Sequence, residues 1–265
     1  MRNNTYALLI FALLSTLLLS GCITDSKTRS FHALDPSFSA ALEHERKKNF
    51  STIRTDMAMK GLSIGTPLYI RAFKSEMEME LWAQNPYTGE YKLYKTYPIC
   101  QKSGSLGPKI KEGDRQTPEG FYDVTPDRMN PHSKFYLSFN IGYPNAYDRA
   151  HGHTGSALMV HGACVSAGCL AMNDNNIGEI YLIIDESFKN GVHRIPVHIF
   201  PFRMTSDQLA LRQNSPWMPF WLDLKKGYDY FEKYHVPPDM GLEHNRYVLN
   251  DKKSPETPWK VSSTN

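Results

Sequence analysis

Short apolar runs and alternating apolar and polar positions dominate the chain as far as Pro201, and both patterns predict β-strands. The clearest alternation runs from Glu76 to Leu81, where glutamates and large apolar side chains take turns. We expect Glu76, Glu78 and Glu80 to line the solvated face of a strand. The predicted strands are residues 68–73, 76–81, 91–99, 121–124, 136–141, 157–160 and 195–200.

An apolar spacing of 3.6 residues predicts helices before, within and after this β-rich part. Residues 37–59 carry a thin apolar stripe among many charges, and residues 174–190 place large apolar side chains on one face. After the strands, Thr205 can cap a short helix, and an aromatic stripe from Trp217 to Phe231 predicts a longer one. We expect this stripe to pack against the main domain. The expected fold class is mainly β with α, with a helical C-terminal extension.

Composition and charge narrow the class of protein. The chain has 265 residues, of which 41% are hydrophobic, which suffices for one sizeable core, or for one core and a smaller annex. The formal net charge is only +3, and the basic residues are scattered among acidic ones. A nucleic-acid partner is therefore not expected, because binding to phosphate backbones calls for a concentrated basic surface.

The first 22 residues are typical of a signal peptide. Arg2 gives a small positive start, and residues 6–19 form an apolar region too short to span a bilayer comfortably. The Leu-Ser-Gly-Cys motif ending at Cys22 resembles the bacterial lipobox, in which the cysteine becomes lipidated; a plain secretory cleavage site is the alternative. Ile23 follows in place of the aspartate associated with inner-membrane retention. We expect a periplasmic protein, anchored by lipid to the outer membrane.

Residues 160–172 gather a thiol, an imidazole, a hydroxyl and glycines in one turn-prone segment after an apolar strand. His161 can take the proton of Cys169 if the intervening loop folds back, and the resulting thiolate can attack a carbonyl to form an acyl-enzyme. The backbone N–H groups of Gly168 and Cys169 are the expected oxyanion donors. Ser166 can hydrogen-bond the thiolate or orient the imidazole. This chemistry needs no cofactor.

The mature domain has three cysteines, which are Cys100, Cys164 and Cys169. In an oxidising compartment an odd number leaves at least one free thiol or an unusual arrangement. A Cys100–Cys164 disulfide would leave Cys169 free, whereas a Cys164–Cys169 disulfide would silence the site until it is reduced. The sequence does not choose between these pairings.

The pair His161-Gly162, followed by the run Ser-Ala-Gly-Cys that ends at Cys169, resembles the HG…SxGC signature of the YkuD, or L,D-transpeptidase, family. The segment 104–122, with Thr-Pro-Glu-Gly-Phe-Tyr at its end, is similar to the TPxGxY motif of that family. The likeness covers roughly residues 67–202. It implies a β-sandwich-like catalytic domain, a substrate containing meso-diaminopimelate, and roles for Cys169 as nucleophile and His161 as general base.

One departure concerns the residue two positions after the nucleophile, where the cross-linking enzymes of the family have arginine and this chain has Ala171. The His-to-Cys spacing is also shorter than usual in those enzymes. The compact motif, the lipobox and the C-terminal extension resemble the YafK-like subgroup, which includes an amidase that detaches the murein lipoprotein from peptidoglycan. Gly162 and His153 are candidate substrate contacts.

The resemblance therefore implies a hydrolase that cleaves the meso-diaminopimelate link between peptidoglycan and an attached lipoprotein through a Cys169 acyl-enzyme. The expected partners are peptidoglycan stem peptides, the peptidoglycan-linked lipoprotein and, through the N-terminal lipid, a membrane. Two alternatives stay open. One is a transpeptidase that forms peptidoglycan cross-links or attaches proteins to peptidoglycan, and the other is a catalytically silent lipoprotein that binds peptidoglycan.

A zinc site is a further alternative to these functions. His151, His153, His161, Cys164 and Cys169 are ligand types that zinc accepts. No CxxC or HExxH spacing joins them, so we expect no metal. The predicted organisation is a lipoprotein signal peptide (1–22), a tether and N-terminal helix (23–60), a YkuD-like catalytic domain (61–203) and a helical C-terminal extension (204–265).

Overall fold

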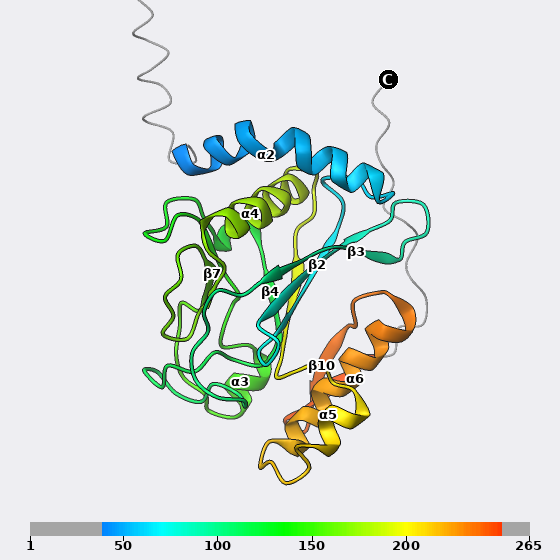
Figure 1. Cartoon of the computed structure of the whole chain (residues 1–265). Coiled ribbons are helices and arrows are strands. Elements are labelled where there is room, and N and C mark those ends of the chain that lie inside the picture. Colours follow the sequence, from blue (N-terminus) through cyan, green and yellow to red (C-terminus); the bar gives the residue numbers. More distant parts are fainter. Residues whose placement is uncertain (1–38, 251–265) are drawn as a thin grey trace, which may run out of the picture. The chain divides into compact units, whose positions relative to one another are not determined.

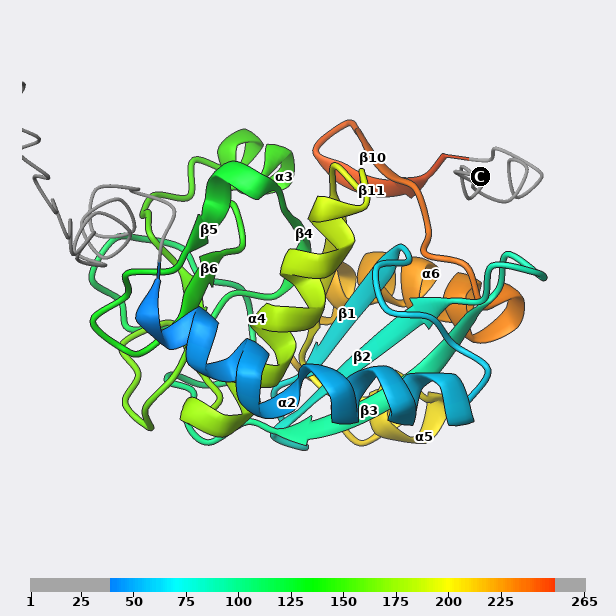
Figure 2. The ribbon, with the colours of Figure 1, turned by 90° about the horizontal axis from the view of Figure 1, so that it is seen from above.

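The computed structural model describes residues 39–250, so the predicted signal peptide, Cys22 and the first part of the tether lie outside the described residues, as do residues 251–265. Within this range, no helix is long and apolar enough to cross a membrane. Two sheets and a hairpin make up the β-structure, and helices cover the larger sheet on both faces (Figures 1 and 2). The prediction of a mainly β fold with added helices is confirmed.

The larger sheet has five strands in the order β3-β2-β1-β9-β4. Its central strand, β1, is buried along its whole length, and it pairs antiparallel with β2 and parallel with β9. The strands predicted at 68–73 and 195–200 match β1 and β9 to the residue. The bounds are Leu68–Phe73 for β1, Glu78–Gln84 for β2, Tyr91–Pro98 for β3, Gly120–Val124 for β4 and Ile195–Phe200 for β9.

The smaller sheet holds the segment that the sequence singled out. Its strands are short and run in the order β5-β6-β7-β8, with the last pair parallel and the others antiparallel. A short helical turn precedes it, and a five-residue helix lies between β6 and β7. The bounds are Pro126–Arg128 for η1, Met129–Asn130 for β5, Ser138–Asn140 for β6, Ala146–Ala150 for α3, Met159–His161 for β7 and Leu170–Ala171 for β8.

Helices α2 (Ala40–Met59) and α4 (Asp174–Lys189) lie on one face of the larger sheet (Figure 2). Side chains cap both helices at their N-termini, because the Ser39 hydroxyl accepts from the N–H of Leu42 and the Asn173 amide accepts from that of Asn176. The apolar face of α4 packs into the main core, as its spacing predicts. The predicted helix directly behind the cysteine is confirmed.

The opposite face of the larger sheet is covered by the C-terminal segment. Its aromatic stripe, which includes Phe220, Trp221 and Tyr228, packs with Phe73 and Phe200 of the sheet in a second core cluster. The predicted packing of the stripe on the main domain is thus confirmed. The elements are α5 (Ser206–Ala210), α6 (Met218–Tyr234), β10 (Met240–Glu243) and β11 (Arg246–Leu249).

The hairpin of β10 and β11 adds to the helical extension that the sequence predicts. Its two turn residues, His244 and Asn245, have φ values of +48° and +60°, and positive φ at both positions is what a type I′ hairpin turn requires. Such turns usually carry Asn-Gly or Asp-Gly, so the His-Asn pair gave no hairpin signal.

The prediction that Glu76, Glu78 and Glu80 line one solvated strand face is wrong, although the Glu78 side chain is 39% exposed, because Glu76 lies in the turn before β2 and Glu80 is covered. The Glu80 side chain is buried, and its carboxylate accepts from Arg71 Nε at 2.9 Å and from Arg203 Nη1 at 2.7 Å. Arg203 also donates to Glu78, and its backbone N–H donates to Glu76. The face is covered because α6 and the segment after β9 pack over it, and two arginines neutralise the carboxylates there.

Candidate active site

Two parallel strands bring the candidate base and nucleophile together. In the register of β7 and β8, Val160 lies opposite Leu170 and His161 opposite Ala171. Cys169, one residue before β8, is therefore level with Met159, whose backbone N–H lies 3.4 Å from the Cys169 Sγ atom. Since alternate residues of a strand share one face, Cys169 and His161 are diagonal neighbours on the same face of the smaller sheet.

The imidazole of His161 is held in one tautomer. Its Nδ1 atom lies 2.5 Å from the carbonyl oxygen of Gly162, and because a carbonyl only accepts, Nδ1 carries the proton and Nε2 is left as an acceptor. The Phe135 ring stacks on the imidazole with a centroid separation of 4.7 Å. Burial lowers the pKa of His161, against the effect of the Gly162 bond, so the ring is neutral at neutral pH.

Gly162 leaves no room for a side chain. A Cβ atom there would lie 2.5 Å from Asp174 Oδ1 and 2.6 Å from the carbonyl oxygen of Phe135. The same Asp174 oxygen accepts from the N–H of Ala163 at 2.8 Å and so fixes the backbone just after the base. In this structure Gly162 therefore positions His161, and its contact with substrate stays a prediction.

The surroundings of Cys169 favour the protonated form of its thiol. Burial raises the pKa of Cys169, and the Met159 N–H opposes this only in part. Within the described residues that N–H is the single hydrogen-bonding partner of the Sγ atom. The site thus pairs a neutral thiol with a neutral imidazole whose Nε2 is an acceptor, which is the arrangement for general-base activation of a nucleophile.

Hydroxyl groups fix the turn that carries the nucleophile. Ser166 Oγ donates to the carbonyl oxygen of Cys169 at 2.8 Å, and Thr117 Oγ1 lies 3.4 Å from the same oxygen. Ser103 Oγ lies 3.1 Å from Ser166 Oγ. The structure therefore places the Ser166 hydroxyl on the backbone of the turn. Nothing in the sequence marked Ser103 as part of the site, whereas Thr117 stands in the TPxGxY-like motif.

The expected oxyanion donors lie at the start of β8. Gly168 has a φ of +130°, a conformation that only glycine adopts readily, and its N–H lies 3.3 Å from Ser166 Oγ. The N–H of Cys169 makes no hydrogen bond to any of residues 39–250. Cys169 N–H is therefore the better placed of the two for a substrate oxygen.

The structure settles the cysteine pairing that the sequence left open. Cys100 and Cys164 form a disulfide with a Cα–Cα distance of 5.4 Å, and Cys169 is free. Gln101 forms a bridge to Ala171 of β8, so the disulfide ties the loop before the nucleophile to the chain on the other side of β8. The candidate nucleophile, Cys169, is thereby left as a free thiol.

The remaining candidate residues do not join this site. His153 lies just after α3, where its Nδ1 atom is 3.2 Å from Asp148 Oδ1 and its ring meets that of Tyr147. Among residues 39–250, no three His, Cys, Asp or Glu side chains are grouped as a metal site would need. Cys164 is bonded to Cys100 and has no thiolate to offer.

Comparisons with known proteins agree with this geometry. The sequence profile described as L,D-transpeptidase catalytic domain, YkuD, matches residues 69–199. A curated protein of Escherichia coli K12, "Putative L,D-transpeptidase YafK", is 42% identical over 207 residues, which cover 78% of this chain and 83% of that protein, and its counterpart in E. coli O157:H7 gives the same values. This chain belongs to the L,D-transpeptidase family.

Two solved structures show a weaker likeness to this L,D-transpeptidase-family chain. The helical cell shape determining protein Pgp2 of Campylobacter jejuni is 20% identical, with 69% of this chain and 68% of that chain covered and a TM-score of 0.41. Bd1075 of Bdellovibrio bacteriovorus is 20% identical, with coverages of 64% and 61% and a TM-score of 0.35. With TM-scores of 0.41 and 0.35, these two structures add nothing to the family assignment.

Membership of the L,D-transpeptidase family supports an enzyme that acts on peptidoglycan. The position at which the resemblance leads us to expect arginine is Ala171, which is fully buried in β8. Its backbone N–H donates to the carbonyl oxygen of Gln101 at 2.9 Å. An arginine in this setting would have to bury or redirect its guanidinium, whereas Ala171 presents no charged group at this position.

Proposed function

We propose that this protein is a periplasmic cysteine amidase that cleaves the meso-diaminopimelate link between peptidoglycan and a covalently attached lipoprotein. The observation that carries the proposal is the free thiol of Cys169, which lies level with Met159, two residues before His161, while the bond from His161 Nδ1 to the Gly162 carbonyl leaves Nε2 as an acceptor. The likeness to the YafK-like subgroup and the buried Ala171 support cleavage over cross-linking.

The proposed reaction has two halves. His161 Nε2 takes the thiol proton as Cys169 Sγ attacks the carbonyl carbon, and the negative oxygen is stabilised by the N–H of Cys169. The tetrahedral intermediate then expels the lipoprotein amine, which receives the proton from His161, and a thioester remains. Water, deprotonated by the same imidazole, attacks the thioester and releases the carboxylate and the thiol.

Transpeptidation is the second candidate, because the family name describes it and the first half-reaction is shared. The two differ only in whether water or an amine receives the acyl group. Mass spectrometry of sacculi treated with the purified protein separates them: loss of protein-linked muropeptides indicates the amidase, and gain of new cross-links indicates the transpeptidase.

The nucleophile is tested by the same assay. We expect Cys169→Ala to abolish release of the lipoprotein, while Cys100→Ser retains part of it, because that change removes the disulfide but leaves the Cys169 thiol in place. Circular dichroism of both variants shows whether each is folded. Undiminished release by folded Cys169→Ala protein would refute the mechanism, and absence of any change to sacculi by the folded, reduced wild type would favour the silent binding protein.

A further inference from the structure

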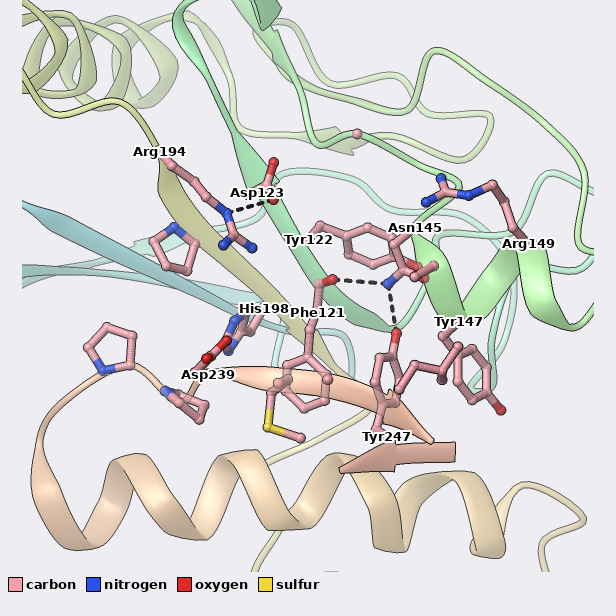
Figure 3. Close-up of a pocket in the computed structure, with 18 of the residues that line it drawn as sticks. Phe121, Tyr122, Asp123, Asn145, Tyr147, Arg149, Arg194, His198, Asp239 and Tyr247 are labelled. Atoms are coloured by element: carbon pink, nitrogen blue, oxygen red, sulfur yellow. Dashed lines mark hydrogen bonds and ion pairs between the residues drawn. The ribbon is translucent and has the colours of Figure 1, made fainter. Parts of the chain in front are cut away.

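A pocket of 620 Å³ lies away from the catalytic turn, and its lining includes neither Cys169 nor His161. Its floor is formed by β4 and β9, where Phe121 lies opposite His198 and Asp123 opposite Pro196. One wall is α3 and another is the β10–β11 hairpin, as Figure 3 shows. A cavity of this size accommodates a small ligand or a short peptide.

Arginine side chains with free donors line the pocket. Arg194 donates to Asp123 Oδ2 through Nε alone, at 2.8 Å, and its side chain is 65% exposed. Arg149 donates through Nη1 to the carbonyl oxygen of Pro144 and has no carboxylate partner among the described residues. Both guanidinium groups therefore keep N–H donors for a ligand, and a guanidinium fits a carboxylate with two parallel hydrogen bonds.

The charge of the pocket is positive on balance. Asp123 is shared between Arg194 and Arg128, so a single carboxylate faces two guanidinium groups. Asp239 is the other acidic residue of the lining, as Figure 3 shows. The three arginines outnumber these two carboxylates, which favours an anionic ligand.

The hairpin supplies a strand edge. Met240, Gly241 and Leu242 of β10 line the pocket, and within residues 39–250 β10 pairs only with β11. Its other edge offers unpaired N–H and C=O groups to an extended chain. The hairpin is fixed, because Arg246 of β11 donates two hydrogen bonds of 2.9 Å to the buried Asp223 of α6.

We propose that this pocket binds an extended peptide segment with carboxylate groups, which pairs with the free edge of β10 and is held by Arg149 and Arg194. The partly exposed ring of Phe121 provides apolar surface for its side chains. A peptide is favoured over a bare anion because only a peptide uses both the guanidinium groups and the strand edge. The site is independent of the acyl-transfer chemistry proposed above.

Calorimetric titration of the Cys169→Ala protein tests this, since that variant binds ligands without turnover. The probe is acetyl-Glu-Phe-Val-Glu with a free C-terminal carboxylate, and the neutral control is acetyl-Gln-Phe-Val-Gln amide. We expect the acidic peptide to bind and the neutral one to bind at least about tenfold more weakly, because charge-assisted hydrogen bonds are lost. Binding weakens with added salt.

Variants locate the binding. We expect Arg149→Gln and Arg194→Gln each to weaken binding about tenfold, and Arg54→Gln, on the exposed surface of α2, to leave it unchanged. No binding of the acidic peptide, or equal binding by the double arginine variant, overturns the proposal. Inorganic phosphate that binds as tightly as the peptide would reduce the site to an anion site and also overturn it.

Discussion

The buried carboxylate of Glu119 allows the sharpest test of how the C-terminal extension supports the catalytic domain. Its Oε1 atom accepts from Lys74 Nζ at 2.9 Å and from the N–H of Gly107 at 2.7 Å, while Oε2 accepts from Trp221 Nε1 of α6 at 2.8 Å. The neighbouring Thr117 contacts the backbone of Cys169. One carboxylate thus links the residue that follows β1, the loop before β4, α6 and, through Thr117, the turn that carries Cys169.

The perturbation is Glu119→Gln, which keeps the shape and removes the charge. Lys74 has no exposed surface, and besides the one oxygen of the glutamine it would keep the carbonyl oxygens of Gly107 and Thr117, at 3.0 and 2.8 Å. Removing one partner of a buried ion pair typically costs about 3–5 kcal/mol of unfolding free energy, because the other charge is left uncompensated. Since glutamine retains one acceptor oxygen, we expect a loss of about 3 kcal/mol.

The dependence of this loss on pH has a definite sign. Burial lowers the pKa of Lys74, and the attraction of Glu119 opposes that shift. Without Glu119 the pKa falls further, so the folded variant binds fewer protons than its unfolded state over a wider range below the ordinary lysine pKa. Its stability therefore rises with pH more steeply than that of the wild type.

Urea unfolding followed by intrinsic fluorescence, at neutral pH and at about pH 9, measures both effects. The matched control is Glu232→Gln, which removes the half-exposed partner of Arg71 and is expected to cost no more than about 1 kcal/mol. A loss for Glu119→Gln no larger than that of the control, or a pH dependence equal to the wild type, would refute the reasoning.

Two further predictions concern the catalytic turn itself. Because burial raises the pKa of Cys169, we expect the rate of its alkylation by iodoacetamide to keep rising through about pH 9. Mass spectrometry at a series of pH values measures this rate. A plateau below neutral pH would instead indicate a preformed thiolate–imidazolium pair. Gly168→Ala places a Cβ 3.3 Å from Leu158 in a backbone conformation that strains alanine. We therefore expect this variant to lose about 1–3 kcal/mol of unfolding free energy and to be less active. The control is Gly152→Ala, at a φ of +67° with open space around it, which has the backbone strain without the site.

Elements with a strong pattern over their whole length are the ones that the sequence predicts well. The buried run of β1, the apolar strand β9 and the one-sided helix α4 were each placed within a residue or two. The environment of Glu80 was predicted wrongly, because alternation along a strand identifies two faces but does not say that a later segment will cover the polar one. The covering arginine, Arg203, is far away in the sequence.

In the candidate site, too, local features were predicted and long-range contacts were not. A resemblance and a spacing of eight residues sufficed to nominate Cys169 and His161, since both lie in one local motif. The sequence could not show which cysteine pairs with Cys164, because the pairing depends on a long-range contact that places Gln101 beside β8. For the same reason the stacking of Phe135 on the imidazole had no signal in the sequence.

The loop between His161 and Cys169 folds back as expected, and the structure shows what holds it there. Residues 162–169 form the connection between two parallel strands, β7 and β8, which is shorter than the dozen or more residues that such connections usually need. Strands of three and two residues cannot fix their own register. The contacts that fix it here lie outside them: β6 on one side, Gln101 on the other, and the Cys100–Cys164 disulfide across the connection. The register of β7 against β8 therefore depends on contacts outside the two strands, so we expect the disulfide to position Cys169 relative to His161 as well as to stabilise the fold.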